Sequence, residues 1–130
     1  MAAHKSPAGP LDAKLLRGGL VDCEFIIHFL QLREATGFNP DLGPAIEALT
    51  AEGLLPGDFR AHYDLLSRLI VAARLLAPDG KPPPAAAQAA LAAACRSPDF
   101  DGLLHALAEA RHGVAQVWAE TFGENLEEAT

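Results

Sequence analysis

Composition and charge indicate that this 130-residue chain is globular and limit the partners it can have. Half of its residues are hydrophobic and 21% are charged, a balance typical of a folded domain, and the length allows one domain with one core. The net charge of −7 argues against a nucleic-acid-binding surface. No run of about 18 uncharged apolar residues is present that would span a membrane.

The hydrophobic pattern predicts an all-α fold, a single helical bundle of about five helices. Residues 1–19 are expected to form an irregular lead-in, because prolines and glycines interrupt them. Apolar residues then recur at spacings of three and four, or alanine dominates, and glycines and prolines separate these segments. The predicted helices cover residues 20 to about 35, 42–52, about 56–76, roughly 85–96, and a last segment that runs to about 122.

The remaining boundaries follow from local composition. The stretch SPD at 97–99 is interpreted as a cap followed by proline in the first turn of the last helix. The bundle is expected to span residues 20–123, and the acidic residues 124–130 to fray. No segment shows the alternation of apolar and polar residues that a strand would need.

The first predicted helix is apolar all round, which is typical of a central helix whose polar residues need partners. One interpretation is structural. In this interpretation Asp22 would be the N-cap of the helix. A buried hydrogen-bond network would be formed by three residues that share one stripe at 100° per residue, Glu24, His28 and Gln31.

The alternative interpretation is functional. Lys14, Asp22 and Glu24 would face another domain or a ligand, and Gly18 and Gly19 would let the backbone approach closely. In this hypothesis the glycine pair turns the chain so that Lys14 reaches back towards the two acids. Residue chemistry alone leaves both interpretations open.

Other candidate chemistry is weak. His105, Glu109 and His112 share a helix face and could bind a metal, but a solvated stripe is the better interpretation. Cys23 and Cys95 lack paired spacing, so they are predicted to be buried free thiols, which fits a reducing cytoplasm.

The stretch LDAKLLRGGLVDCEFIIHFLQL, residues 11–32, resembles the signature D-x-K-x-x-x-GG-x-x-D-x-E-F of bacterial glutamine-synthetase adenylyltransferase. Looser helical similarity extends the resemblance to about residues 8–123. Val21–Asp22 stands where the deadenylylating half of that enzyme has an Arg-Glu pair, which points to the carboxy-terminal, adenylylating half. The signature positions are Asp12, Lys14, Gly18, Gly19, Asp22, Glu24 and Phe25.

The resemblance implies a helical domain that follows a nucleotidyltransferase domain. Such an enzyme uses Mg²⁺ and ATP to transfer AMP to a tyrosine of glutamine synthetase. It reverses the transfer by phosphorolysis, under control of glutamine and the signalling protein PII. The Gly-Ser turn and spaced aspartates that hold Mg²⁺ in this family have no counterpart here. We therefore expect a cytoplasmic fragment, cut just before the signature, that carries no catalytic residue, metal ligand or cofactor and is inactive alone.

Three hypotheses remain open at this stage. The bundle could contribute Lys14, Asp22 and Glu24 to the edge of an active site as nucleotide- or substrate-positioning residues. It could instead be a non-catalytic interaction module that docks glutamine synthetase or PII, or a self-contained helical protein. If an upstream domain is the packing partner, the residues before about Gly18 should be poorly packed in this chain.

Overall fold

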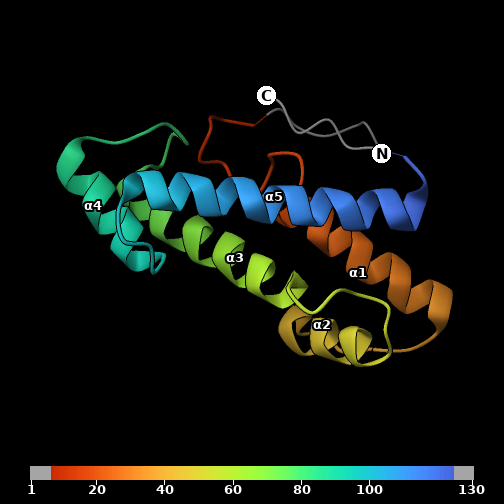
Figure 1. The fold of residues 1–130 in the computed structure, drawn as a ribbon. Coiled ribbons are helices and arrows are strands. Elements are labelled where there is room, and N and C mark those ends of the chain that lie inside the picture. Colours follow the sequence, from red (N-terminus) through yellow and green to blue (C-terminus); the bar gives the residue numbers. More distant parts are fainter. Residues whose placement is uncertain (1–6, 125–130) are drawn as a thin grey trace.

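The structure, a computed structural model, describes residues 7–124, and every regular element in that range is an α-helix (Figure 1). The predicted all-α fold is therefore confirmed. The predicted fraying of the acidic tail concerns residues that lie, apart from Glu124, outside the described range. The helices are α1 (Leu20–Glu34), α2 (Leu42–Ala51), α3 (Phe59–Leu76), α4 (Ala85–Ala94) and α5 (Phe100–Phe122).

Helix α3 is the centre of the bundle, because it packs against each of the other four helices. The longest helix, α5, lies across α3, while α4 closes one end of the pair and α1 with α2 closes the other (Figure 1). The period predicted for α3 is confirmed in its buried residues Phe59, Leu66 and Ala73. Full burial of one such large side chain contributes about 1.5–3 kcal/mol.

Helix α1 is less central than its composition suggested. Ile26, Ile27 and Leu30 are fully buried, but Leu32 is 77% exposed and His28 is also exposed. The reason is that α2, α3 and α5 cover one side of α1 and leave the other open to solvent. Apolar composition on all sides of a helix was therefore a poor guide to its burial.

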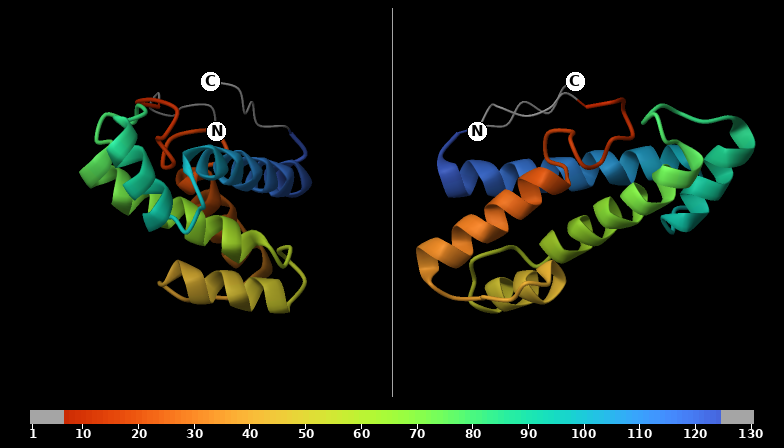
Figure 2. Two further views of the ribbon diagram at one scale, coloured as in Figure 1. Left: turned by 60° about the vertical axis from the view of Figure 1, so that its left-hand side comes forward. Right: turned by 180° about the vertical axis from the view of Figure 1, so that it is seen from behind.

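The N-terminal segment, residues 7–19, forms turns without a regular helix, as expected. The expectation of poor packing is wrong for its described part, since Leu11, Ala13 and Leu16 are at most 2% exposed and belong to the core. Figure 2 shows this segment beside the loop between α3 and α4. The Leu11 N–H donates to the carbonyl oxygen of Gly80 in that loop at 2.8 Å.

The N-cap of helix α5 lies two residues after Ser97, the cap that the sequence predicted. Asp99 is its N-cap, and the carboxylate accepts from the Gly102 N–H at 2.7 Å. Pro98 therefore precedes the cap and does not occupy the first turn. The carboxylate satisfies one of the N–H groups that a helix start leaves without an intrahelical acceptor.

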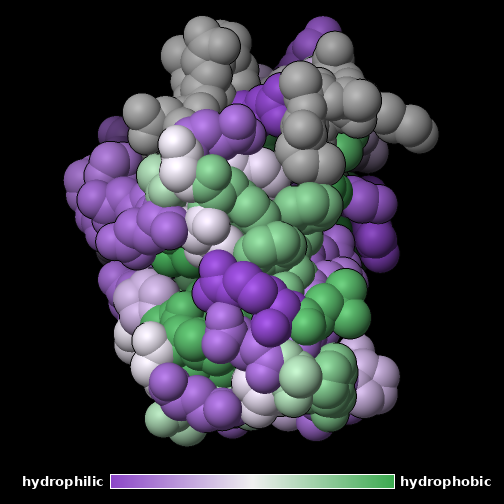
Figure 3. Space-filling model, turned by 90° about the vertical axis from the view of Figure 1, so that its right-hand side faces the viewer, coloured by the Kyte–Doolittle hydropathy of each residue, from purple (hydrophilic) through white to green (hydrophobic). Residues whose placement is uncertain are grey.

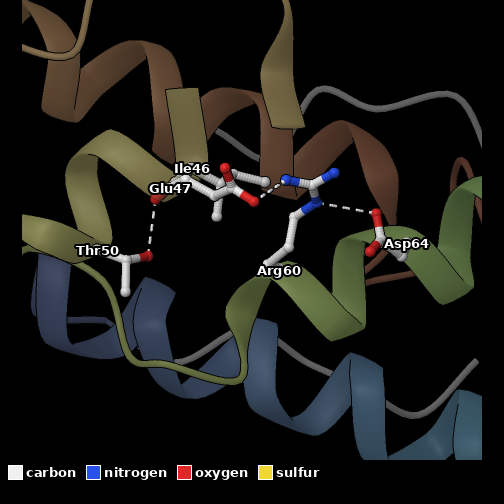
Figure 4. A network of polar contacts seen from close by, with 5 residues as sticks. All are labelled: Ile46, Glu47, Thr50, Arg60 and Asp64. Carbon is white, nitrogen blue, oxygen red and sulfur yellow. Dashed lines mark hydrogen bonds and ion pairs between the residues drawn. The ribbon is translucent and has the colours of Figure 1, made fainter. Parts of the chain in front are cut away.

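A polar network joins α2 to α3 (Figure 4). The Arg60 guanidinium contacts Asp64, four residues along the same helix, at 3.0 Å, and also Glu47 of α2 at 2.7 Å. Thr50 donates to the carbonyl oxygen of Ile46 at 2.7 Å. These ion pairs are partly exposed, so each contributes at most about 1 kcal/mol.

The surface carries a few large apolar side chains. On the end of the bundle drawn in Figure 3, hydrophobic atoms lie in patches between hydrophilic ones. Among the helices that the structure describes, none has the length and apolar character needed to cross a bilayer. The exposed large apolar residues in the described part are Leu32, Phe38, Val71, Leu75 and Leu104.

Candidate functional site: the glycine turn and the adjoining pocket

The glycine pair forms a tight turn immediately before α1. Gly18 has a φ of +77°, in the left-handed region that favours glycine, and Gly19 is the N-cap of α1. Asp22 lies in the first turn of α1, is 1% exposed, and accepts the Gly18 N–H at 2.7 Å. The prediction that Asp22 is the N-cap is therefore wrong, because α1 starts two residues before it. Its carboxylate instead reaches back to hold the turn.

The turn brings the chain back alongside the start of α1. The Leu20 N–H donates to the carbonyl oxygen of Ala13 at 2.8 Å, and the Val21 N–H donates to that of Lys14 at 3.1 Å. These two donors are among the N–H groups that have no acceptor within the helix. The backbone reversal expected at the glycine pair is thus present, and it serves as the cap that α1 lacks in side chains.

Helix α5 fixes the turn from the other side. A Cβ on Gly18 would overlap the carbonyl oxygen of Arg111, and the Arg111 Nε donates to the carbonyl oxygen of Arg17 at 2.8 Å. A Cβ on Gly19 would overlap the carbonyl oxygen of Ala13. Both glycines are therefore required by close backbone approach. Arg111 was missed in the sequence, because 94 residues separate it from its acceptor and no local motif marks it.

The expected meeting of Lys14 with the two acids is not found. Lys14 is exposed, Asp22 is buried and Glu24 is half-buried, and no ion pair joins Lys14 to either acid within residues 7–124. The turn brings Lys14 close to α1 through its backbone, while its side chain lies elsewhere. A positioning function of these three residues stays a prediction.

The predicted buried network along Glu24, His28 and Gln31 is also wrong. Only Gln31 is buried, at 8% exposed, and its Nε2 donates to the carbonyl oxygen of Gly37 at 2.8 Å. Gln31 thereby ties the end of α1 to the loop that follows.

The Lys14 side chain lines a surface pocket of about 300 Å³ between the N-terminal segment and the end of α3. Asp12 and Arg74 are the other charged residues of its wall. The Asp12 carboxylate accepts two backbone N–H groups, from Ala8 at 2.9 Å and from Leu15 at 3.2 Å. Asp12 therefore holds the shape of the segment and still contributes its negative charge beside the positive charges of Lys14 and Arg74.

The histidine stripe on α5 lies in solvent. The Nε2 of His105 lies 2.6 Å from a carboxylate oxygen of Glu109, and the two side chains are 77% and 65% exposed. This exposure agrees with the predicted solvated face. Within the described residues no three His, Cys, Asp or Glu side chains are grouped so that they could hold a metal ion.

Both cysteines are buried and free, as predicted. Burial raises the pKa of the Cys23 thiol, and the nearby charges of Asp22 and Glu24 raise it further. Burial also raises the pKa of Cys95, although Arg68 opposes that shift. The raised pKa of each thiol favours the protonated form, which is the less nucleophilic one.

Comparison with known proteins found a similar enzyme. The chain is 36% identical over 122 residues to the bifunctional glutamine synthetase adenylyltransferase/adenylyl-removing enzyme of Caulobacter vibrioides. This chain is therefore similar in sequence to a glutamine synthetase adenylyltransferase. The match covers 85% of the chain, so the resemblance drawn from residues 11–32 is confirmed, but it spans only 12% of the Caulobacter enzyme. No family model and no solved structure matched the chain.

Proposed function

We propose that this bundle is the helical part of an enzyme system that adenylylates and deadenylylates glutamine synthetase and so regulates nitrogen assimilation. The similarity to the Caulobacter enzyme over 85% of the chain carries this proposal. The buried free thiols fit a reducing cytoplasm as the place of action.

The chemistry in this proposal belongs to a nucleotidyltransferase domain that transfers AMP from ATP with Mg²⁺. Magnesium prefers clustered carboxylate oxygens, and residues 7–124 contain no such ligand group. We therefore assign no metal-dependent step to the bundle. Its contribution would be to position the nucleotide or the tyrosine where the two domains meet.

The glycine turn is suited to such positioning because it is held from three directions. The Asp22 carboxylate, the Arg111 guanidinium and the backbone of Ala13 all fix residues 17–20. A misplacement of about 1 Å at a reacting group can reduce the rate by about 100-fold. Lys14, which is exposed, and Glu24, which is half-buried, are the proposed contacts, and Asp22 acts through the turn.

A chimeric enzyme tests the proposal. This chain would replace the matching region of the Caulobacter enzyme, and AMP transfer from ATP to glutamine synthetase would be measured by mass spectrometry of the modified tyrosine. We expect transfer and its reversal to be retained. A chimera that is folded by circular dichroism, yet inactive in both directions, would contradict the proposal. The chain alone is expected to transfer no AMP.

Kinetics of the same chimera separate active-site support from docking. Lys14→Gln and Glu24→Gln should lower kcat or raise the KM for ATP if these residues position the nucleotide. Arg96→Gln is the matched control, because Arg96 is an exposed cation outside the pocket. A rise confined to the KM for glutamine synthetase would favour the docking alternative.

The second candidate function, a non-catalytic interaction module, is favoured by one observation. Val71 and Leu75 are 62% and 83% exposed and lie one turn apart on α3, a spacing that places both on one face. Large exposed apolar side chains often mark contact surfaces. In this proposal the face docks glutamine synthetase or the PII protein. Binding of each purified protein to the chain, and its loss in Leu75→Ser, is the test.

A further inference from the structure

One peptide group of the glycine turn is held at both ends by charged side chains. The carbonyl oxygen of Arg17 accepts from the Arg111 Nε at 2.8 Å, and the N–H of Gly18 donates to the Asp22 carboxylate at 2.7 Å. This carbonyl and this N–H belong to the same peptide unit, which is planar and trans. In a trans unit the two groups point to opposite edges of the plane, so the guanidinium and the carboxylate hold the unit from opposite sides.

The charges of the two side chains match the polarity of this peptide group. A peptide unit carries a dipole of about 3.5 D, whose negative end is the oxygen and whose positive end is the N–H. The guanidinium of Arg111 contacts the negative end, and the carboxylate of Asp22 contacts the positive end. Hydrogen bonds with one ionised partner are roughly twice as strong as neutral ones. Rotation of the peptide plane would break both bonds, so the two side chains together fix its orientation.

Helix α5 acts on this peptide through both the side chain and the backbone of one residue. Arg111 lies near the middle of α5, and 94 positions separate it from Arg17. Its carbonyl oxygen occupies the space that a Cβ on Gly18 would need, at the residue whose φ is +77°. The path of the chain through the turn therefore depends on a helix that lies outside the signature.

The orientation of the peptide after Arg17 also determines the backbone position of Lys14. The Val21 N–H at the start of α1 donates to the carbonyl oxygen of Lys14 at 3.1 Å, which closes a loop over residues 14–21. The peptide between Arg17 and Gly18 lies in the middle of that loop. A turned peptide would change the direction of the chain at Gly18 and would separate the two ends of the loop.

We propose that Arg111 is a positioning residue of the signature. It acts with Asp22 on the peptide between Arg17 and Gly18, and the oriented peptide sets the backbone position of Lys14. The catalytic consequence rests on the proposed function, in which Lys14 contacts the nucleotide or the tyrosine. Arg111 contacts neither in this account and acts only through the turn.

Amide hydrogen exchange of the 130-residue chain, followed by nuclear magnetic resonance, tests the backbone part of this inference. Because the Gly18 N–H is bonded to Asp22, its response to a change at Arg111 reports what passes across the peptide. We expect Arg111→Met to accelerate exchange at Gly18 by about tenfold, which corresponds to the loss of one hydrogen bond. Arg111→Lys should accelerate it less, because a positive charge is retained.

Two comparisons separate this effect from a general loss of stability. The amides of Leu66 and Leu69, which are fully buried in α3, report destabilisation of the whole bundle. Arg96→Gln removes an exposed cation and should leave exchange at Gly18 unchanged. The inference would be overturned if Arg111→Met accelerated exchange at Gly18 no more than at Leu66 and Leu69, or if Arg96→Gln had the same effect.

Kinetics of the chimeric enzyme test the catalytic consequence. If Arg111 acts through Lys14, Arg111→Met should lower kcat in the parent chimera and should lower it less than twofold further in a chimera that carries Lys14→Gln. Independent sites give additive losses of free energy, so a loss that is the same with and without Lys14→Gln would overturn the positioning role. Arg111→Lys should recover part of the rate. An inactive chimera would contradict the proposed function, and exchange at Gly18 would then decide this inference.

Discussion

Replacing Gly18 by alanine is the sharpest test of how the glycine turn is held. The substitution forces a side chain into a φ of +77°, which costs about 1–2 kcal/mol for a residue with a Cβ. It also places that Cβ against the carbonyl oxygen of Arg111. Because the contact is with backbone, α5 or the turn must shift, and such overpacking costs about 1–3 kcal/mol. We expect a total loss of about 2–5 kcal/mol, a large part of the stability of about 5–15 kcal/mol typical of a domain.

Gly53→Ala is the matched control for this substitution. Gly53 has the same φ of +77°, but nothing lies within 4 Å of the position of its Cβ. It should therefore lose only the conformational component of about 1–2 kcal/mol. Urea denaturation followed by circular dichroism would give both free energies of unfolding, with unchanged slopes confirming that the denatured states are comparable. Equal losses in the two variants would refute the close approach of the turn to α5.

Four further experiments have definite expected outcomes. Ala35→Gly should raise the free energy of unfolding by about 1 kcal/mol, measured by thermal denaturation, because Ala35 ends α1 at a φ of 52°. Asp99→Ala should lower it by about 1 kcal/mol in the same assay, because the carboxylate that caps α5 is lost. Iodoacetamide at about pH 8 should modify Cys23 more slowly than Cys95, as mass spectrometry would show, because burial raises the pKa of Cys23 with no opposing cation. Since that pKa is higher in the folded chain than its ordinary 9.0, the wild type should lose stability relative to Cys23→Ala as the pH rises above 9.0, by up to about 1.4 kcal/mol per pH unit.

The sequence predicted the fold correctly where local residue patterns determine the structure. Apolar residues at helical spacing located α3 and α5, and the prolines between Ala77 and Ala85 located the break before α4. The burial of individual side chains was harder to predict, because it depends on which neighbouring helices cover each face of a helix. Leu32 has the composition of a core residue, yet it lies on the side of α1 that no other helix covers.

The candidate site was likewise predictable only in part. The reversal at Gly18–Gly19 was predictable, since two glycines before a helix permit it. The position of the Lys14 side chain was not, because the wall it joins is supplied by Arg74, on another helix. Arg111 was equally hidden, since its hydrogen bond to Arg17 depends on how α5 crosses the turn. Contacts between distant segments depend on how the helices pack, and local patterns in one sequence predict that packing only in part.

The signature behaves as one structural unit with an inner and an outer side. Gly18 and Asp22 are buried and define the path of the backbone, whereas Lys14 is exposed. The two sides are coupled, because the carbonyl oxygen of Lys14 accepts the N–H of Val21 at the start of α1. We therefore expect a change that loosens the turn to displace the backbone of Lys14, which lines the adjoining pocket. The buried residues of the motif therefore fix the backbone position of Lys14, and this backbone pairing sets the spacing between the lysine and the glycines.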